Sequence, residues 1–218
     1  MSDMIRNTLK RHPNSIMILS YLFMMTASSF LGSIAKNYAF VFLLILPILL
    51  LILNLWIRTS LKEIWQNFKT IKWGKLVLAF LGILIVIGFF TFVSFDTIQT
   101  HSKNTFDIMK MMHQYWYMPI YVVLIAPIVE ELTFRSSGYI IATRLAGAVT
   151  TNATVVKITA YFLVGIAFAI MHADNMMAIY MIFGWLLQKI TNKWGLKYAI
   201  AIHIGINLFG FAIMLASR

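Results

Sequence analysis

The run WYMPIYVVLIAPIVEELTFRSSGYII, residues 116–141, decides the fold of this 218-residue chain. It is long enough to cross a bilayer as a helix, since a span needs about 20 mainly apolar residues. The run nevertheless contains Glu130 and Glu131 and, four residues later, Arg135. Ionisable side chains inside a membrane span are costly, so their presence predicts a functional site within the membrane.

The composition of the whole chain agrees with a membrane protein. Hydrophobic residues make up 61% of the chain and charged residues 11%, whereas a soluble domain has about 25% charged residues. The net charge of +11 comes from bases that flank the apolar runs, so we interpret them as topology signals and expect no nucleic-acid partner. The chain has no cysteine, which excludes disulfides, thiol nucleophiles and cysteine-ligated metals.

Seven stretches qualify, or nearly qualify, as spans. Continuous apolar runs of this length fit helices, because lipid offers no other partner to backbone polar groups. We therefore predict an all-α, polytopic membrane helix bundle with about seven transmembrane helices and an active-site cavity between them. The seven predicted spans are residues 14–34, 39–57, 76–95, 116–141, 155–173, 176–190 and 198–216.

The distribution of bases predicts the orientation and the division of the chain. Most Lys and Arg residues fall in connections on the side of the N-terminus, which predicts a cytoplasmic N-terminus. The basic start followed by an apolar run also resembles a signal peptide, but the later spans favour an uncleaved first helix. We expect N-terminal transmembrane helices and an amphipathic connector in 1–115, and a catalytic helical core in 116–218. Within the first part, residues 58–75 fit either a helix on the membrane surface or a solvated connector.

The two adjacent glutamates are expected to have different neighbours. Residues four apart share a helix face, so Glu131 can meet Arg135 while Glu130 points about 100° away. Burial then favours the neutral form of Glu130, which suits a general base. The alternative is a purely structural ion-pair network of both glutamates with Arg135.

Two further polar pairs lie on later spans. Phe168 and His172 share a face at the end of the fifth span, and His203 and Asn207 share one early in the seventh. A lone span histidine is more often a hydrogen-bonding partner than a catalyst. Three polar clusters in one small bundle, however, satisfy one another only by converging. Convergence would supply a base, imidazoles and an amide donor, which can activate water and stabilise an oxyanion.

This convergence places a demand on helix geometry. The order of spans puts His172 near the outer end of the fifth span and His203 near the inner end of the seventh. A common site therefore requires tilted helices or shifted boundaries.

A metal site is the competing interpretation. Glu130, His172 and His203 match a zinc ligand set that leaves one position open for water. The chain lacks a His-Glu-x-x-His pair, and Asn207 suits an oxyanion donor better than a zinc ligand. We favour no metal or other cofactor, with zinc as the alternative.

The ordered motifs Glu-Glu-x-x-x-Arg, Phe-x-x-x-His and His-x-x-x-Asn resemble the CAAX protease and bacteriocin-processing family, also called CPBP or Abi, of intramembrane endopeptidases. The resemblance covers about residues 116–210. It implies that Glu130 and His172 activate the water and that His203 and Asn207 form the oxyanion hole. It gives a supporting role to the remaining motif residues, which are Glu131, Arg135 and Phe168.

The resemblance also sets the expected function. The short chain resembles the bacterial branch, which predicts a bacterial cell membrane and argues against prenylated substrates. The expected substrate is a peptide or membrane protein in the bilayer, with a role in bacteriocin immunity or processing. The runner-up is a non-enzymatic immunity or binding protein. A proton-coupled transporter is a third alternative, weakened by the lack of repeated halves.

Overall fold

The structure is a computed structural model that describes residues 12–34, 45–58, 68–93, 108, 110–112, 115–172 and 176–216. Within these ranges the regular structure is helical and no strand occurs, which confirms the all-α prediction. Half of the predicted connector 58–75, residues 59–67, and most of the stretch between the third and fourth predicted spans lie outside the described residues. The division into two parts at residue 116 stays a prediction.

Each of the seven predicted spans corresponds to a helix or a helical run. The fourth is longer than expected, because one uninterrupted run continues to Val149. The elements are α2 (Pro13–Ile34), α3 (Leu46–Arg58), α5 (Trp73–Val93), α7 (Met118–Ile120), η3 (Tyr121–Ile125), α8 (Ala126–Glu131), η4 (Leu132–Gly138), α9 (Tyr139–Val149), α10 (Ala153–His172), α11 (Met177–Trp194) and α12 (Leu196–Ala216).

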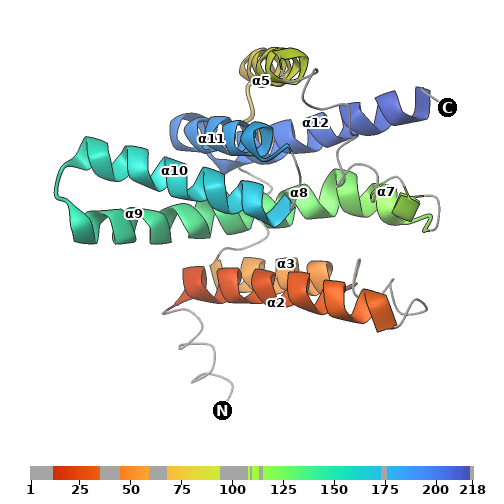
Figure 1. Cartoon of the computed structure of the whole chain (residues 1–218), viewed down its shortest axis with the longest axis horizontal. Coiled ribbons are helices and arrows are strands. Elements are labelled where there is room, and N and C mark those ends of the chain that lie inside the picture. Colours follow the sequence, from red (N-terminus) through yellow and green to blue (C-terminus); the bar gives the residue numbers. More distant parts are fainter. Residues whose placement is uncertain are drawn as a thin grey trace.

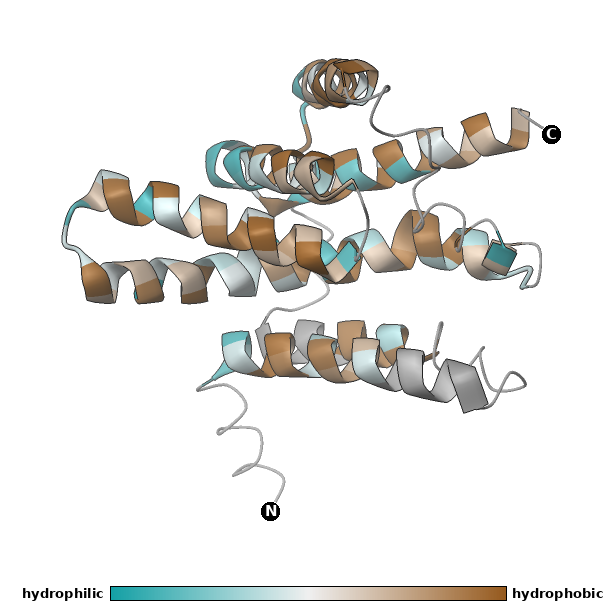
Figure 2. Cartoon of the chain, viewed as in Figure 1, coloured by the Kyte–Doolittle hydropathy of each residue, from teal (hydrophilic) through white to brown (hydrophobic). Residues whose placement is uncertain are grey.

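The outward faces of the helices are apolar, as Figure 2 shows for α5 and α12. On α5 only Ile83 is buried, and large apolar side chains such as Leu78, Ile85 and Phe92 are exposed. Among the described helices, α5, α10 and α12 are long and apolar enough to cross a bilayer. The protein is therefore a membrane helix bundle, while the total of seven spans and the orientation stay predictions.

The helices pack around a hairpin of α9 and α10 (Figure 1). Helices α2 and α3 lie on one side of this hairpin, and α11 and α12 lie on the other, with α5 beyond α12. Helices α10 and α11 pack closely at two glycines. A Cβ on Gly165 would lie 3.1 Å from the carbonyl oxygen of Met181, and a Cβ on Gly184 would lie 3.3 Å from the Cα of Gly165. Small residues thus allow the two backbones to approach.

The inclination of α11 lets His172 and His203 lie at similar depths, as a common site requires. In Figure 1, α11 is seen partly end-on while α10 and α12 lie lengthwise. Because α11 is inclined, its 18 residues cover a distance along the bundle axis that is shorter than the helix itself. His203, two turns into α12, accordingly lies near the level of His172 at the end of α10, and Phe168 contacts both rings.

An open apolar groove of about 380 Å³ lies between α2 and α3. None of the predicted site residues lines it, so the active-site cavity stays a prediction. Its lining residues are Leu19, Ser20, Phe23, Leu46, Leu49 and Leu50.

Candidate active site

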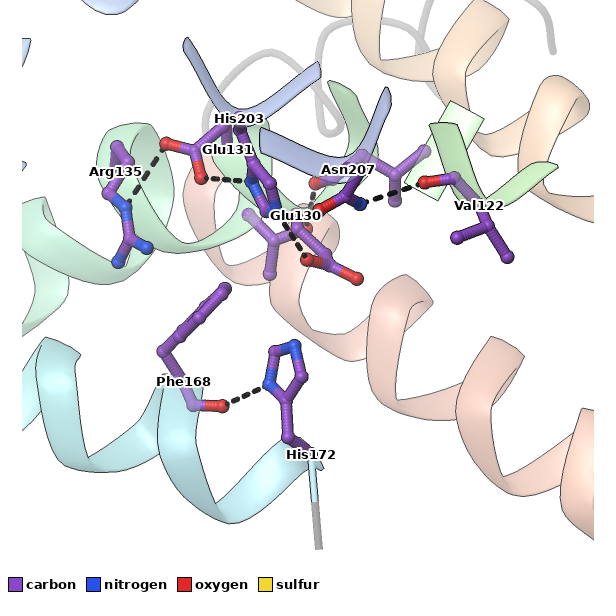
Figure 3. Close-up of polar contacts among 10 residues, drawn as sticks. Val122, Glu130, Glu131, Arg135, Phe168, His172, His203 and Asn207 are labelled. Carbon is purple, nitrogen blue, oxygen red and sulfur yellow. Dashed lines mark hydrogen bonds and ion pairs between the residues drawn. The ribbon is translucent and has the colours of Figure 1, made fainter. Parts of the chain in front are cut away.

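Glu131 is the centre of the polar cluster. Its side chain is 0% exposed, and both carboxylate oxygens have a partner. Oε2 accepts a hydrogen bond from Arg135 Nε at 3.1 Å, and Oε1 lies 2.9 Å from His203 Nδ1. A buried carboxylate is tolerated when it is paired in this way. The predicted pairing of Glu131 with Arg135 is therefore present, and it extends to α12 (Figure 3).

Arg135 is held by an aromatic face as well as by the carboxylate. Its guanidinium lies 4.5 Å from the centre of the Phe168 ring, a cation–π contact that is stronger where water is excluded. Phe168 also packs edge-on against Phe134, with ring centres 5.3 Å apart. Phe168, predicted as a supporting residue, therefore joins the arginine to the histidines.

Glu130 and Glu131 flank the two nitrogens of one imidazole. His203 Nε2 lies 3.7 Å from Glu130 Oε2, and Nδ1 faces Glu131. The Glu130 side chain is 16% exposed, whereas that of Glu131 is fully buried. The sequence-based expectation that the two carboxylates have different surroundings is thus met. The direct partner of Glu130 among the described residues is His203 and not Arg135.

His172 is oriented by two contacts. Its Nδ1 lies 2.8 Å from the carbonyl oxygen of Phe168, so the hydrogen on Nδ1 is donated to the backbone and Nε2 remains an acceptor. Its ring stacks on Tyr180 of α11 with centres 4.1 Å apart and planes inclined by 23°. Figure 3 shows the far edge of the ring turned toward Glu130.

The side chain of Asn207 is held by the backbone carbonyl of Val122. This carbonyl lacks a backbone donor because Pro127 has no N–H. In the π-helical segment η3 the N–H of Ala126 bonds to the oxygen of Tyr121, five residues earlier. The next donor in this register would be residue 127, which is Pro127 and has no N–H. The oxygen of Val122 instead accepts a hydrogen bond from Asn207 Nδ2 at 2.9 Å. One of the two amide hydrogens of Asn207 is thus used for positioning and the other remains.

The two glutamates lie in α8, between the π-helical segments η3 and η4. A π-helical turn inserts an extra residue and changes which side chains face the bundle; such turns are frequent at functional sites. At the end of η4 the N–H of Tyr139 bonds to the oxygen of Phe134, five residues earlier. A period of 3.6 residues alone does not predict this local register.

Three tyrosines near the site were missed by the sequence analysis. Tyr180 stacks on His172, while Tyr21 of α2 and Tyr121 of η3 interact electrostatically with Glu130. The ring of Tyr21 also packs against Phe134, with centres 5.5 Å apart. The available signal was a phenol hydroxyl within each apolar run. No spacing connected these tyrosines to the three motifs.

The predicted zinc alternative has only part of its ligand geometry. In the part of the chain that the structure describes, no group of three His, Asp or Glu side chains is placed to hold a metal ion. His203 Nδ1 is committed to Glu131, and His172 Nδ1 is committed to a backbone carbonyl. Each histidine has only Nε2 left to offer a metal, and zinc stays the alternative to the favoured metal-free site.

A comparison with known protein families matches the segment that contains the three motifs. Residues 112–209 match the model of a family described as "Type II CAAX prenyl endopeptidase Rce1-like". No curated protein and no solved structure matches the chain. The resemblance to CAAX endopeptidases that the three motifs indicated is therefore confirmed for this region, and the family implies an intramembrane protease. The bacterial branch stays a prediction.

Proposed function

Starting from the Rce1-like region, we propose that this protein is an intramembrane endopeptidase that hydrolyses a peptide bond with glutamate-activated water. One observation carries the proposal: Glu130, His172, His203 and Asn207 come from three separate helical segments and lie around one position (Figure 3). Their chemistry matches the needs of amide hydrolysis, which are a base, an oriented water and donors for an oxyanion.

Glu130 and His172 would activate the water. Glu130 accepts a proton from the water as its oxygen attacks the carbonyl carbon of the substrate, and then returns the proton to the departing amine. His172 orients the same water through Nε2, because Nδ1 is held by the Phe168 carbonyl. The stacked Tyr180 ring fixes the plane of the imidazole. In this mechanism water attacks the substrate directly. No nucleophilic side chain and no covalent enzyme–substrate intermediate is needed.

His203 and Asn207 would stabilise the oxyanion. Glu131 accepts the Nδ1 hydrogen of His203, and Nε2 would carry the hydrogen that is donated toward the developing negative charge. The second amide hydrogen of Asn207 supplies the other donor. Removal of one oxyanion donor costs about 10²–10³ in kcat in well-studied hydrolases. Glu131 and Arg135 act through His203, by fixing its ring and neutralising charge around it.

The test of this function is the cleavage of membrane-anchored peptides by the purified protein in vesicles. New termini would be identified by mass spectrometry for the wild type, Glu130→Ala and His172→Ala. We expect cleavage by the wild type alone, with both variants folded as judged by circular dichroism and thermal unfolding. Undiminished cleavage by either variant would refute the mechanism.

The same variants separate the enzyme from the runner-up, an immunity protein that acts by binding. If the protein protects a cell from a bacteriocin through proteolysis, Glu130→Ala abolishes protection. If it protects through binding alone, protection survives this substitution.

For the cellular setting, we propose the bacterial cell membrane with a cytoplasmic N-terminus and a role in bacteriocin immunity or processing. The excess of bases on the N-terminal side supports the orientation. The substrate would be a peptide or membrane-associated protein. Matched peptides with and without a prenyl group would show whether the lipid is recognised, and we expect cleavage without it.

A further inference from the structure

Four lysines from two distant parts of the sequence form one surface cluster. The lysine cluster consists of Lys72, Lys75, Lys193 and Lys197. The backbone N–H of Lys72 donates to the hydroxyl of Tyr198 at 2.8 Å, and the ammonium of Lys197 donates to the hydroxyl of Thr70. These contacts join the residues just before α5 to the first turn of α12.

Aromatic rings hold the ammonium groups of Lys75, Lys193 and Lys197 in place. Trp194 has the ammonium of Lys75 5.9 Å from its ring centre and that of Lys193 at 5.7 Å. Lys197 lies 5.7 Å from the ring centre of Tyr198. Cation–π contacts of this kind restrain a lysine without neutralising its charge. The cluster therefore keeps its positive charges close together.

Within the described part of the chain, no carboxylate compensates this charge. Glu130 and Glu131 are the only acidic residues in the described ranges, and both contact His203 inside the polar cluster. Like charges that are held together repel, and a surface of one sign concentrates ions of the opposite sign. The lysine cluster therefore attracts anions to this surface.

Its position indicates the source of that anion. Helices α5 and α12, which begin at the cluster, are both long and apolar enough to span a bilayer. Trp73, the first residue of α5, is 73% exposed. Exposed tryptophans and lysines at the end of an apolar helix are typical of the level of the lipid headgroups. A phosphate at that depth belongs to a phospholipid.

We propose that the lysine cluster binds the headgroup of an anionic phospholipid, between the start of α5 and the α11–α12 turn. The headgroup phosphate lies among the ammonium groups of Lys75, Lys193 and Lys197, and the acyl chains follow the apolar surface of α5. Basic pockets between membrane helices bind anionic lipids by the same physics. The bound lipid would hold α5 against α12, which carries His203 and Asn207.

The experiment compares lipid binding by two double variants that lose equal charge. The test variant is Lys75→Gln/Lys193→Gln. The control is Arg144→Gln/Lys157→Gln, since both residues are exposed and flank the α9–α10 turn at the same end of the hairpin as the α11–α12 turn (Figure 1). Native mass spectrometry of the detergent-solubilised full chain would count bound phosphatidylglycerol and phosphatidylcholine across a lipid titration.

We expect the wild type and the control to retain phosphatidylglycerol in preference to phosphatidylcholine. The test variant should bind phosphatidylglycerol about 10- to 30-fold more weakly, from the known contribution of each lysine near an anionic surface. Equal binding by the two double variants would refute the site and leave only a general charge effect. Equal retention of both lipids by the wild type would refute it as well. Inorganic phosphate that displaced the lipid at millimolar concentration would identify a free anion as the ligand and overturn the lipid assignment.

Discussion

His203 and Arg135 share a single carboxylate: Glu131 Oε1 lies 2.9 Å from His203 Nδ1, and Glu131 Oε2 lies 3.1 Å from Arg135 Nε. Because Glu131 is completely buried, neither contact is replaced by water when it is lost. The same carboxylate thus anchors α12 to the helical run that carries Glu130. It also aims Nε2 of His203 at the position where we place the substrate.

Removal of Arg135 should destabilise the bundle. Arg135→Met leaves Glu131 buried without its cation, and breaking a buried pair in this way costs about 3–5 kcal/mol. The free energy of unfolding would be measured in mixed micelles with a chemical denaturant. Arg144→Met, at an exposed position of α9, is the matched control and should change stability by no more than about 0.5 kcal/mol. Equal stabilities of the two variants would contradict the role of Arg135.

The prolines offer a test of how Asn207 is held. Pro127→Ala restores an N–H in register with the oxygen of Val122, which then competes with the amide of Asn207. We expect kcat to fall about tenfold, the kinetic equivalent of one hydrogen bond of about 1.4 kcal/mol. Thermal stability should not decrease, because a helical proline is removed. Pro119→Ala on the same run is the control, and a kcat loss of the same size there would argue against the proposed competition.

Tyr180 should act on the reaction through the ring of His172. Tyr180→Leu removes the stacked ring, which contributes about 0.5–1.5 kcal/mol in aromatic pairs. We expect kcat to fall about 2- to 10-fold with little change in KM. Tyr180→Phe keeps the ring and should retain most of the activity. If the Phe variant is as impaired as the Leu variant, the hydroxyl and not the stacking is what matters.

The contact between α10 and α11 can be tested by a pair of glycine substitutions. In Gly165→Ala the new Cβ lies 3.1 Å from a backbone oxygen of α11, so we expect a loss of about 1–3 kcal/mol in the free energy of unfolding. Gly147→Ala meets no atom within 4 Å, and it should gain up to about 1 kcal/mol from helix propensity. Denaturation of both variants under the same conditions gives the comparison. A stabilised Gly165→Ala would show that the two helices are less closely packed than the structure has them.

Local spacing in the sequence was sufficient to predict contacts within one helix. The pairing of Glu131 with Arg135 follows from a separation of four residues, and the common face of Phe168 and His172 is shown by their ring centres, which lie 4.4 Å apart. Long apolar runs likewise predicted the helices, because lipid permits few other backbone arrangements. These features depend on short-range geometry alone.

Contacts between helices depended on geometry that no local pattern contains. The approach of His172 to His203 follows from the inclination of α11 in Figure 1. The bond from Asn207 to Val122 depends on the π-helical register before Pro127. Tyr180 reaches His172 only once α10 and α11 are packed. These contacts depend on the tertiary arrangement. From the sequence we could predict only that the polar side chains converge, because polar groups in lipid need partners.

The role of Glu130 as the general base is tested by single-turnover cleavage of one identified peptide by the wild type and by Glu130→Gln, each with and without a zinc chelator. The substituted amide keeps the size and polarity of the glutamate side chain but cannot accept the proton of the water. We predict wild-type cleavage that the chelator does not affect, and a rate for Glu130→Gln about 10²–10⁴-fold lower, which is the usual contribution of general-base catalysis. Wild-type rates in Glu130→Gln, or activity that the chelator abolishes and zinc restores, would contradict this prediction.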